Sequence, residues 1–123
     1  MNNIQKNLEA QEVIKRVLGK VITDVEFGNN EFFLDFDDGT TLKIFSSSVH
    51  EVSKDSGFDE DESILIGKKL TLVNLGYSYS VVHQQHTREV SFFTESDTFS
   101  IWFNHFHKTK KPFIYIEAET GTR

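Results

Sequence analysis

The residues of this chain best suited to chemistry are four histidines in two closely spaced pairs. His83 and His86 lie three residues apart in VVHQQHTRE, and His105 and His107 lie two apart in FNHFHK. A His-x-His pair on a strand points both imidazoles to one face, and imidazole is a common ligand of zinc and related metals. The four histidines therefore suggest a divalent-metal-binding protein or a small β-barrel metalloenzyme. The alternative is that they are structural or surface residues near strand ends, since no carboxylate stands at a recognisable spacing from them.

Other catalytic chemistry finds no support in the sequence. The chain has no cysteine, which removes thiolate catalysis and disulfides. Ser46, Ser47 and Ser48 lack the surroundings of a nucleophile elbow, and there is no glycine-rich phosphate loop or dinucleotide fingerprint. Asp35 and Asp37 are closely spaced, but nothing indicates a cleft that would desolvate one of them. We therefore expect no enzyme and no cofactor.

The element that organises the rest of the chain is a β-meander over residues 20–46. Three segments alternate apolar and polar residues with the period of a strand, namely Lys20–Phe27, Phe32–Phe36 and Thr41–Phe45. Gly28-Asn29-Asn30 and Asp38-Gly39 supply the turns between them. One face of the meander is apolar and must be buried.

The outward face of this meander is the strongest candidate for a binding site. Alternation places acidic and aromatic side chains together on it: Asp24, Glu26, Phe33, Asp35 and Asp37. A second acidic group follows in the connecting loop 47–65: Asp59, Glu60, Asp61 and Glu62. Exposed aromatics beside charge are typical of interfaces, so we expect these residues to bind a partner. The alternatives are a solvated sheet face and a solvated loop.

A helix precedes the meander, and a second β unit follows it. Residues 3–18 have a broad apolar arc and end at Gly19, as expected for a helix packed on a sheet. Residues 66–119 form the second unit, whose start echoes residues 18–25 at an offset of 48, with Gly, Lys, Thr and Val coinciding. This unit is more apolar on both faces, which indicates that the helix or a second copy of the chain covers it.

The resulting prediction is one α+β domain over residues 1–123. It contains an amino-terminal helix and about eight mainly antiparallel strands, with Tyr77–His83 and Phe113–Ala118 among the later ones. The strand pattern leaves three arrangements open, namely a curved sheet, a half-barrel and a two-sheet sandwich.

The charge distribution bears on partners and compartment. The net charge is −6, and residues 1–62 hold six Lys/Arg and fourteen Asp/Glu, which gives −8, against seven and five, or +2, for residues 63–123. An acidic half disfavours nucleic acid as its partner and suits a basic protein. No apolar run is long enough to span a membrane, and the start lacks the pattern of a signal peptide. We expect a cytoplasmic protein that binds a basic protein partner, with a homodimer also open.

Two resemblances add to these expectations. The phrase GKVITDVEFGNNEFFLDFDDGTTLKIF resembles the opening of many small bacterial and phage domains of unknown function. A short, acidic, cysteine-free, β-rich chain is also similar in type to the immunity proteins that neutralise bacterial toxins. That resemblance implies a non-enzymatic inhibitor of a basic toxin or effector domain. The alternatives are the histidine-based metal protein and an accessory subunit that self-associates through the second β unit.

Overall fold

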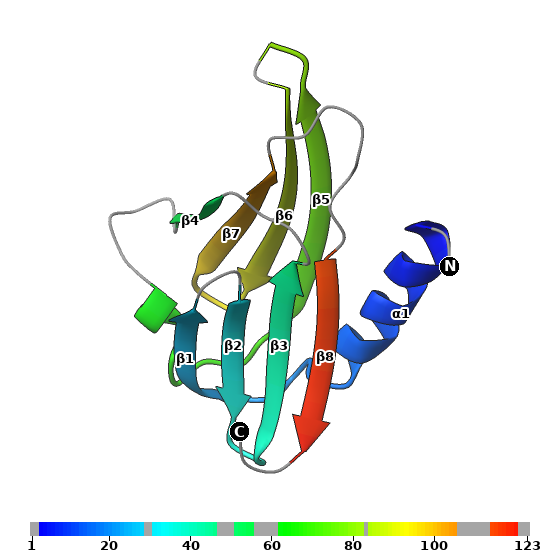
Figure 1. Cartoon of the computed structure of the whole chain (residues 1–123). Helices are drawn as coiled ribbons and strands as arrows, with labels where there is room; N and C mark the ends of the chain where they lie inside the picture. The colour runs from blue at the N-terminus through cyan, green and yellow to red at the C-terminus, as the bar shows by residue number, and fades with distance from the viewer. Residues whose placement is uncertain are drawn as a thin grey trace.

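A computed structural model describes residues 3–28, 31–46, 51–55, 62–82, 84–105 and 114–120 of the chain. Within these ranges the chain is mostly antiparallel β-structure with one α-helix and one short 3-10 helix (Figure 1). In chain order the elements are α1 Asn3–Lys15, β1 Ile22–Gly28, β2 Glu31–Phe36, β3 Thr40–Ser46, β4 Glu51–Asp55, η1 Glu62–Leu65, β5 Leu72–Ser80, β6 Gln85–Phe93, β7 Thr98–His105 and β8 Ile114–Thr120.

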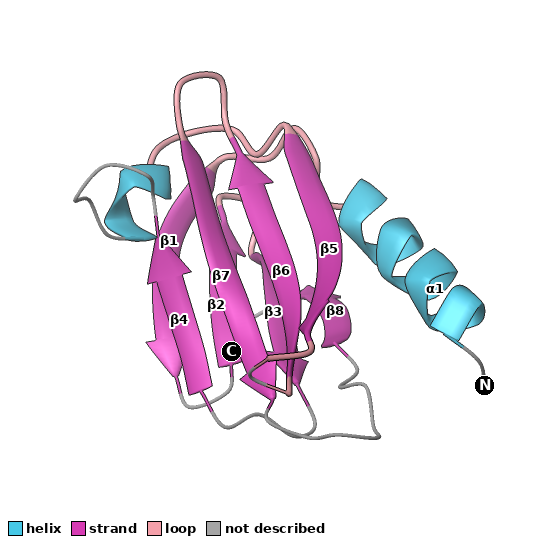
Figure 2. Ribbon diagram, turned by 90° about the horizontal axis from the view of Figure 1, so that it is seen from above, coloured by secondary structure: helices cyan, strands magenta, loops and turns pink. Residues whose placement is uncertain are grey.

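The strands form two four-stranded sheets, ordered β1-β2-β3-β8 and β4-β7-β6-β5. Figure 2 shows the sheets as two layers, and the core lies between them. The Phe32 ring of the first sheet contacts the rings of Phe92 and Phe99 in the second, with centroids 5.3 and 6.0 Å apart. All three side chains are fully buried.

The α+β class expected from the sequence is therefore wrong. The structure is mainly β, with one α-helix in the described residues, and its eight strands are divided between two sheets. The physical reason is that the apolar faces of the two sheets bury each other, so the helix is not needed to cover either of them.

Helix α1 lies beside β8 at one side of the two layers (Figure 1). Ala10 and Ile14 on α1, and Val17 just after it, are buried against the core. The helix ends at Lys15, three residues earlier than expected, because the following amides bond three residues back: the N–H of Val17 donates to the carbonyl of Ile14 at 3.0 Å. No helix in the described ranges is long and apolar enough to cross a membrane.

The chain contains two consecutive meanders that exchange their last strands. Strands β1, β2 and β3 are adjacent in the first sheet, and β5, β6 and β7 are adjacent in the second. The strand after each meander leaves its own sheet: β4 pairs with β7, and β8 pairs with β3. Each sheet therefore consists of three strands from one half of the chain and one strand from the other half.

The two halves meet at an antiparallel bridge between Val21 and Lys69, which are 48 residues apart, as the sequence echo suggests. Four backbone N–H groups around the bridge donate in two equivalent pairs: Gly19 to Leu70 and Gly67 to Ile22, both at 2.7 Å, then Leu70 to Lys20 at 3.0 Å and Ile22 to Lys68 at 2.9 Å. Gly19 and Gly67 have φ of 87° and 86°, a left-handed conformation that favours glycine. The halves are thus related by an approximate two-fold axis through the bridge.

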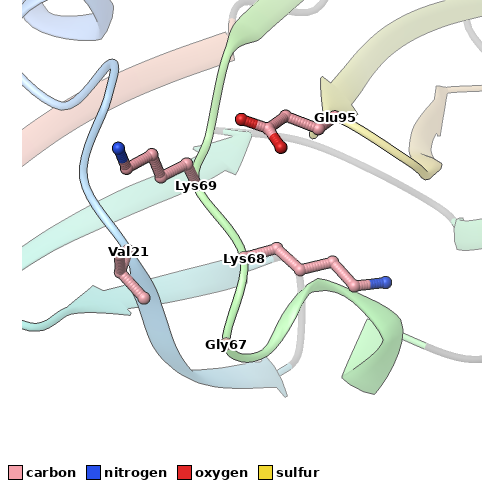
Figure 3. A pocket seen from close by; sticks show the side chains of 5 residues that line it. All are labelled: Val21, Gly67, Lys68, Lys69 and Glu95. Atoms are coloured by element: carbon pink, nitrogen blue, oxygen red, sulfur yellow. The ribbon is translucent and has the colours of Figure 1, made fainter.

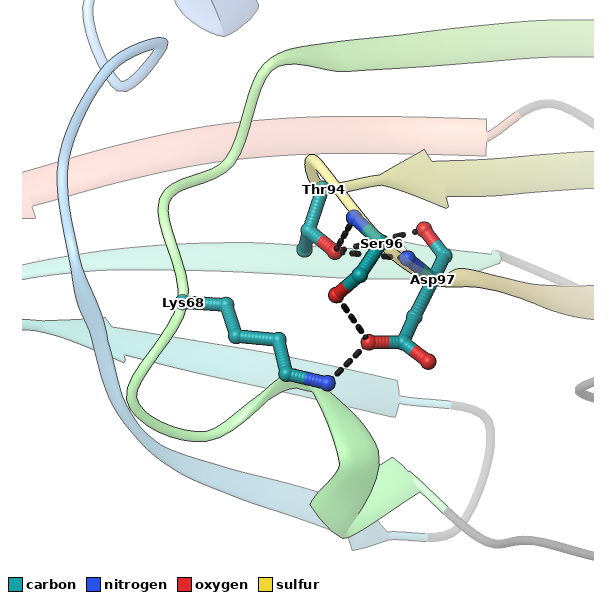
Figure 4. A network of polar contacts seen from close by, with 4 residues as sticks. All are labelled: Lys68, Thr94, Ser96 and Asp97. Carbon is teal, nitrogen blue, oxygen red and sulfur yellow. Dashed lines mark hydrogen bonds and ion pairs between the residues drawn. The ribbon is translucent and has the colours of Figure 1, made fainter.

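An ion pair recurs on each side of this axis. Lys20 donates to Asp38 in the β2–β3 turn, and Lys68 donates to Asp97 in the β6–β7 turn. Asp97 also accepts from the hydroxyl of Ser96 at 2.7 Å, and its N–H donates to the hydroxyl of Thr94 at 3.0 Å (Figure 4). Each ion pair therefore connects the segment just before a meander to the turn between the last two strands of the same meander.

Candidate functional site

The outer face of the first sheet is the main candidate site. Opposite residues on β1, β2, β3 and β8 form three rows across this face. The rows are Asp24-Asp35-Thr41-Glu119, Glu26-Phe33-Lys43-Glu117 and Gly28-Glu31-Phe45-Tyr115. We call these twelve positions the acidic face.

The intervening residues confirm the direction of these side chains. Phe32, Leu34, Phe36, Leu42 and Ile44 are buried between the sheets. Because side chains alternate along a strand, the described side chains of the acidic face point away from the core, and Tyr115 is assigned to this face by its register alone. In the described ranges no helix is placed over it, since α1 lies beside β8 and η1 lies near β1 (Figure 1).

The acidic face carries most of the net charge of the protein. Six of its residues are carboxylates and one is a lysine, a formal charge of −5 out of the −6 of the whole chain. Asp24 stands directly opposite Asp35, a like-charge pairing that is unfavourable across strands. Asp35 accepts from the hydroxyl of Thr41 at 2.7 Å and Asp24 from the N–H of Val25 at 2.9 Å, which offsets part of this cost. The remaining negative charge makes the surface a candidate for binding cations or cationic groups.

Lys43 is the single cation of this face, and it stands between two aromatic rings. Its Nζ lies 4.8 Å from the centroid of Phe45 and 5.7 Å from that of Phe33, and it is 3.8 Å from a carboxylate oxygen of Glu31. Phe33 and Phe45 are partly exposed. The middle of the acidic face therefore consists of two partly exposed aromatic rings with one lysine between them, and carboxylates lie around this group. The arrangement is similar to the aromatic centre and charged rim of interfaces.

The residues expected from the sequence are only partly brought together. Asp24, Glu26, Phe33 and Asp35 all lie on the acidic face. Asp37 lies beyond the end of β2, where it is exposed in the turn. Glu62 begins η1, beside β1 but off the sheet face. Asp59, Glu60 and Asp61 lie outside the described residues.

Three carboxylates of the acidic face were missed by the sequence reasoning. Glu31 has the same alternation as Phe33 and Asp35, so its position could have been predicted. Glu117 and Glu119 reach the face only because β8 pairs with β3, which places Glu117 opposite Lys43. No local pattern in the sequence reports that pairing.

The outer face of the second sheet is the other sheet surface to consider, and its polar groups bond to one another, as the hydroxyl of Thr41 does to Asp35 on the acidic face at 2.7 Å. The carboxylate of Glu89 accepts from the indole N–H of Trp102 at 2.7 Å and from the hydroxyl of Ser91 at 2.9 Å. The side-chain amide of Gln85 donates to Asn104 at 2.9 Å. Among the described side chains of this face Glu89 is the one carboxylate, against six on the acidic face, so this face is the weaker candidate.

Of the four histidines, only His86 has a described side chain. It is 6% exposed, its Nδ1 is 2.6 Å from the hydroxyl of Tyr77, and its ring lies 4.6 Å from that of Tyr79. Its Nε2 is buried without a hydrogen-bond partner. His105 is the cross-strand partner of His86. His83 and His107, and the side chain of His105, lie outside the description.

These described residues contain no group of three or more potential metal ligands. The other neighbour of Tyr77 is a cation and not a metal ligand: the guanidinium of Arg88 lies 4.5 Å from the centre of the Tyr77 ring, and burial lowers the pKa of Arg88. A metal site at His86 therefore stays a prediction that requires ligands from beyond the described part of the chain.

A shallow hollow of about 300 Å³ lies where the two halves meet. It is lined by Val21, Gly67, Lys68, Lys69 and Glu95 (Figure 3). The side chains of Lys68 and Lys69 point in opposite directions, and Lys68 is engaged with Asp97. Since its charged groups diverge, the hollow is a consequence of the bridge and not a site for chemistry.

Comparisons with known proteins do not assign the site. No protein-family model matches the chain, and no curated protein is significantly similar to it in sequence.

Proposed function

We propose that this chain is a non-enzymatic binding protein that docks a basic protein on its acidic face, in the manner of an immunity-type inhibitor of a toxin or effector domain. The observation that carries the proposal is the concentration of a formal −5 on one exposed sheet face around Phe33, Lys43 and Phe45. The proposed partner carries lysines and arginines at the edge of its own site.

The two parts of the acidic face have different roles in this proposal. Its carboxylates attract a basic partner over several ångströms and raise the association rate, an effect that salt screens. The rings of Phe33 and Phe45 lose their remaining water contact on docking and slow dissociation. Charge governs encounter, and aromatic contact governs residence time.

The test is capture of partners from the native host on the purified protein, identified by mass spectrometry at about 50 mM and about 500 mM salt. We expect one stoichiometric basic protein at the lower salt concentration. Asp24→Lys combined with Glu117→Lys and Glu119→Lys should abolish its capture and, once the partner is purified, should lower its association rate at least tenfold. These three side chains are exposed, so the variant should fold.

A matched control makes the same change in net charge elsewhere. Glu9, Glu12 and Glu95 are exposed and lie off the acidic face, so their replacement by lysine should leave capture nearly unchanged. If both variants lost capture of the partner equally, the loss would be due to the change in overall charge and not to the acidic face. Capture that survives the variant of the acidic face would exclude this surface as the binding site.

A second candidate function is supported by the register of β6 and β7, which sets His86 opposite His105. The hydroxyl of Tyr77 holds Nδ1 of His86, as partners of metal-binding histidines commonly do, and leaves Nε2 available to a metal. Elemental analysis of protein purified without a tag tests this function. Less than about a tenth of an equivalent of metal, together with no thermal shift on adding zinc, would exclude it.

A further inference from the structure

The β5 strand differs from the other sheet edges in having no charge. The described sheets end at four strands: β1, β8, β4 and β5. β1 contains Asp24 and Glu26, β8 contains Glu117 and Glu119, and β4 contains Glu51, Lys54 and Asp55.

β5, with the sequence LVNLGYSYS, has no charged residue and no proline. It lies in the longest uncharged stretch of the chain, from Leu70 to Thr87. Charges, prolines and bulges are how proteins keep sheet edges from pairing, so β5 is the edge that lacks this protection.

The outer part of the β5–β6 hairpin is also an addition to the repeated unit. Gly28 pairs with Glu31 in the first half, and Gly76 pairs with Glu89 in the second. Two residues separate the first pair and twelve separate the second. We call residues 77–88 the arm; they stand where the first half has two residues, and the β5–β6 hairpin projects beyond the other strands in Figure 1. The first half forms its hairpin without such a segment, so the repeated unit does not require the arm.

Exposed apolar side chains are concentrated on β5 and the tip of the arm. Among described residues, five of the six large hydrophobic side chains that are exposed belong to this segment: Leu72 at 47%, Tyr77 at 37%, Tyr79 at 39%, Val81 at 77% and Val82 at 86%. Valine is a poor choice for a solvated turn. An exposed apolar turn beside an uncharged edge is expected where another chain packs.

We propose that β5 pairs antiparallel with β5 of a second copy of the chain, with a two-fold axis at Gly76. The sheet β4-β7-β6-β5 of each copy then becomes half of one eight-stranded sheet. Gly76 is the middle of the nine-residue strand Leu72–Ser80, so this register gives the greatest overlap. It places Leu72 opposite Ser80 of the other copy and beside the valines of its tip. On the other face of the joined sheet, Tyr77 lies opposite Leu75 and Tyr79 opposite Val73 of the other copy, so each exposed ring gains an apolar neighbour.

A second copy fits this edge better than a charged partner strand does. In an isologous pairing the same strand supplies both sides, so a charge on it is brought close to the same charge of the other copy. β5 has no charge, so two copies can pair without this repulsion. The acidic face belongs to the other sheet, so pairing through β5 leaves its twelve positions available. The proposal is therefore independent of the proposed function.

Sedimentation at about 100 µM is the first measurement, and we expect a dimer. Asn74→Lys with Ser78→Lys places lysines opposite one another in this register and should give a monomer. Both side chains are exposed, and an unchanged far-ultraviolet circular dichroism spectrum will show that the variant is folded. Gln11→Lys with Thr98→Lys adds the same charge at exposed positions off β5 and should remain dimeric.

Single cysteines test the register, because the natural chain has none. In the proposed dimer Gly76 faces Gly76 at about 4.5–5.5 Å between Cα atoms, which suits a disulfide. A Cβ at Gly76 meets the Cβ of Glu89 at 3.6 Å, an ordinary contact, so Gly76→Cys should be tolerated and should cross-link on mild oxidation. Ser78→Cys is the control, because two Ser78 positions would be roughly 13 Å apart along the strands and should not cross-link.

Each other outcome counts against the proposal. A monomeric wild-type protein overturns it, including the case in which a different protein is captured through β5. A dimer that survives the Asn74/Ser78 lysine variant overturns pairing through this edge. Equal cross-linking of the two cysteine variants overturns the register.

Discussion

Val21 and Lys69 are each other's partner in an antiparallel bridge, and they are also equivalent positions of the internal repeat. The approximate two-fold axis of the molecule passes between them. Beside the bridge, equivalent residues have matching backbone hydrogen bonds and matching φ angles at Gly19 and Gly67, so equivalent substitutions there should have similar effects.

The first prediction concerns the two equivalent glycines beside this bridge. Gly19→Ala and Gly67→Ala should each lower the free energy of unfolding by about 1–2 kcal/mol, because a Cβ is unfavourable at φ near +87°. Urea denaturation measures this change. Gly76→Ala is the control, because Gly76 has no positive φ and has room for a Cβ. The free energy of unfolding of this variant should equal that of the wild type or exceed it slightly. An equal loss at all three positions would contradict the backbone explanation.

The second prediction is a pH dependence of the ion pair between Lys20 and Asp38. The Lys20 ammonium, with help from the N–H of Thr40, lowers the pKa of Asp38 from 3.8 to about 2. A carboxyl whose pKa is lower in the folded state stabilises the fold above its unfolded pKa, and this contribution is lost as the pH falls from about 4 to about 2. Asp38→Asn should therefore melt below the wild type at pH 7, and the two should converge near pH 2.

The equivalent carboxyl should behave in the same way. The Lys68 ammonium and then the Ser96 hydroxyl lower the pKa of Asp97. Asp97→Asn should thus show a deficit in melting temperature at pH 7 that disappears in acid. Because Asp38 is exposed and Asp97 is partly exposed, the deficits should be small and should shrink in high salt. A deficit that persists at pH 2 would mean that the substitutions act through something other than charge.

The third prediction compares two neighbouring phenylalanines on β2. Phe32→Ala should lower the free energy of unfolding by about 3–5 kcal/mol, because its buried ring contacts Phe92 and Phe99 across the two sheets. Phe33→Ala removes a partly exposed ring from the acidic face and should cost below about 1 kcal/mol. Chemical denaturation of both variants checks this. Similar losses would show that β2 does not have the described orientation.

The fourth prediction uses Trp102, the only tryptophan of the chain. Glu89→Ala leaves its indole N–H without the carboxylate that now accepts it, which should destabilise the protein by about 1–3 kcal/mol. The emission of Trp102 should shift as its surroundings change. Glu89→Gln keeps one acceptor oxygen and should recover part of both effects. An unchanged emission spectrum in Glu89→Ala would argue against this bond in solution.

Local patterns predicted the elements of the first meander but not the layers of the fold. The alternation of Phe32, Leu34 and Phe36 correctly assigned a buried face, because alternation depends only on neighbours along one strand. The α+β class was wrong because the pairings of β3 with β8 and of β4 with β7 join segments far apart in the sequence. Lys43 and its partner Glu117 are 74 positions apart, and nothing local selects that pairing.

The second half of the chain was harder to interpret for a local reason. A separate strand was predicted over Tyr77–His83, because Tyr77, Tyr79, Val81 and His83 alternate with the period of a strand. The structure instead continues one strand from Leu72 to Ser80, because Gly76 has ordinary strand geometry opposite Glu89. Part of the candidate site was missed for another reason. Glu31 follows the alternation of β2 and could have been predicted, whereas Glu117 and Glu119 lie on the acidic face only because β8 pairs with β3.

The exchange of final strands between the two halves has a consequence for how the protein is made. Neither half can complete its own sheet, so a chain interrupted before β8 has β3 as a bare edge and lacks two carboxylates of the acidic face. Pairing over such separations is slow compared with forming a hairpin. The acidic face is therefore complete only once residues 74 positions apart have paired, and a chain that ends before β8 would present four of its six carboxylates.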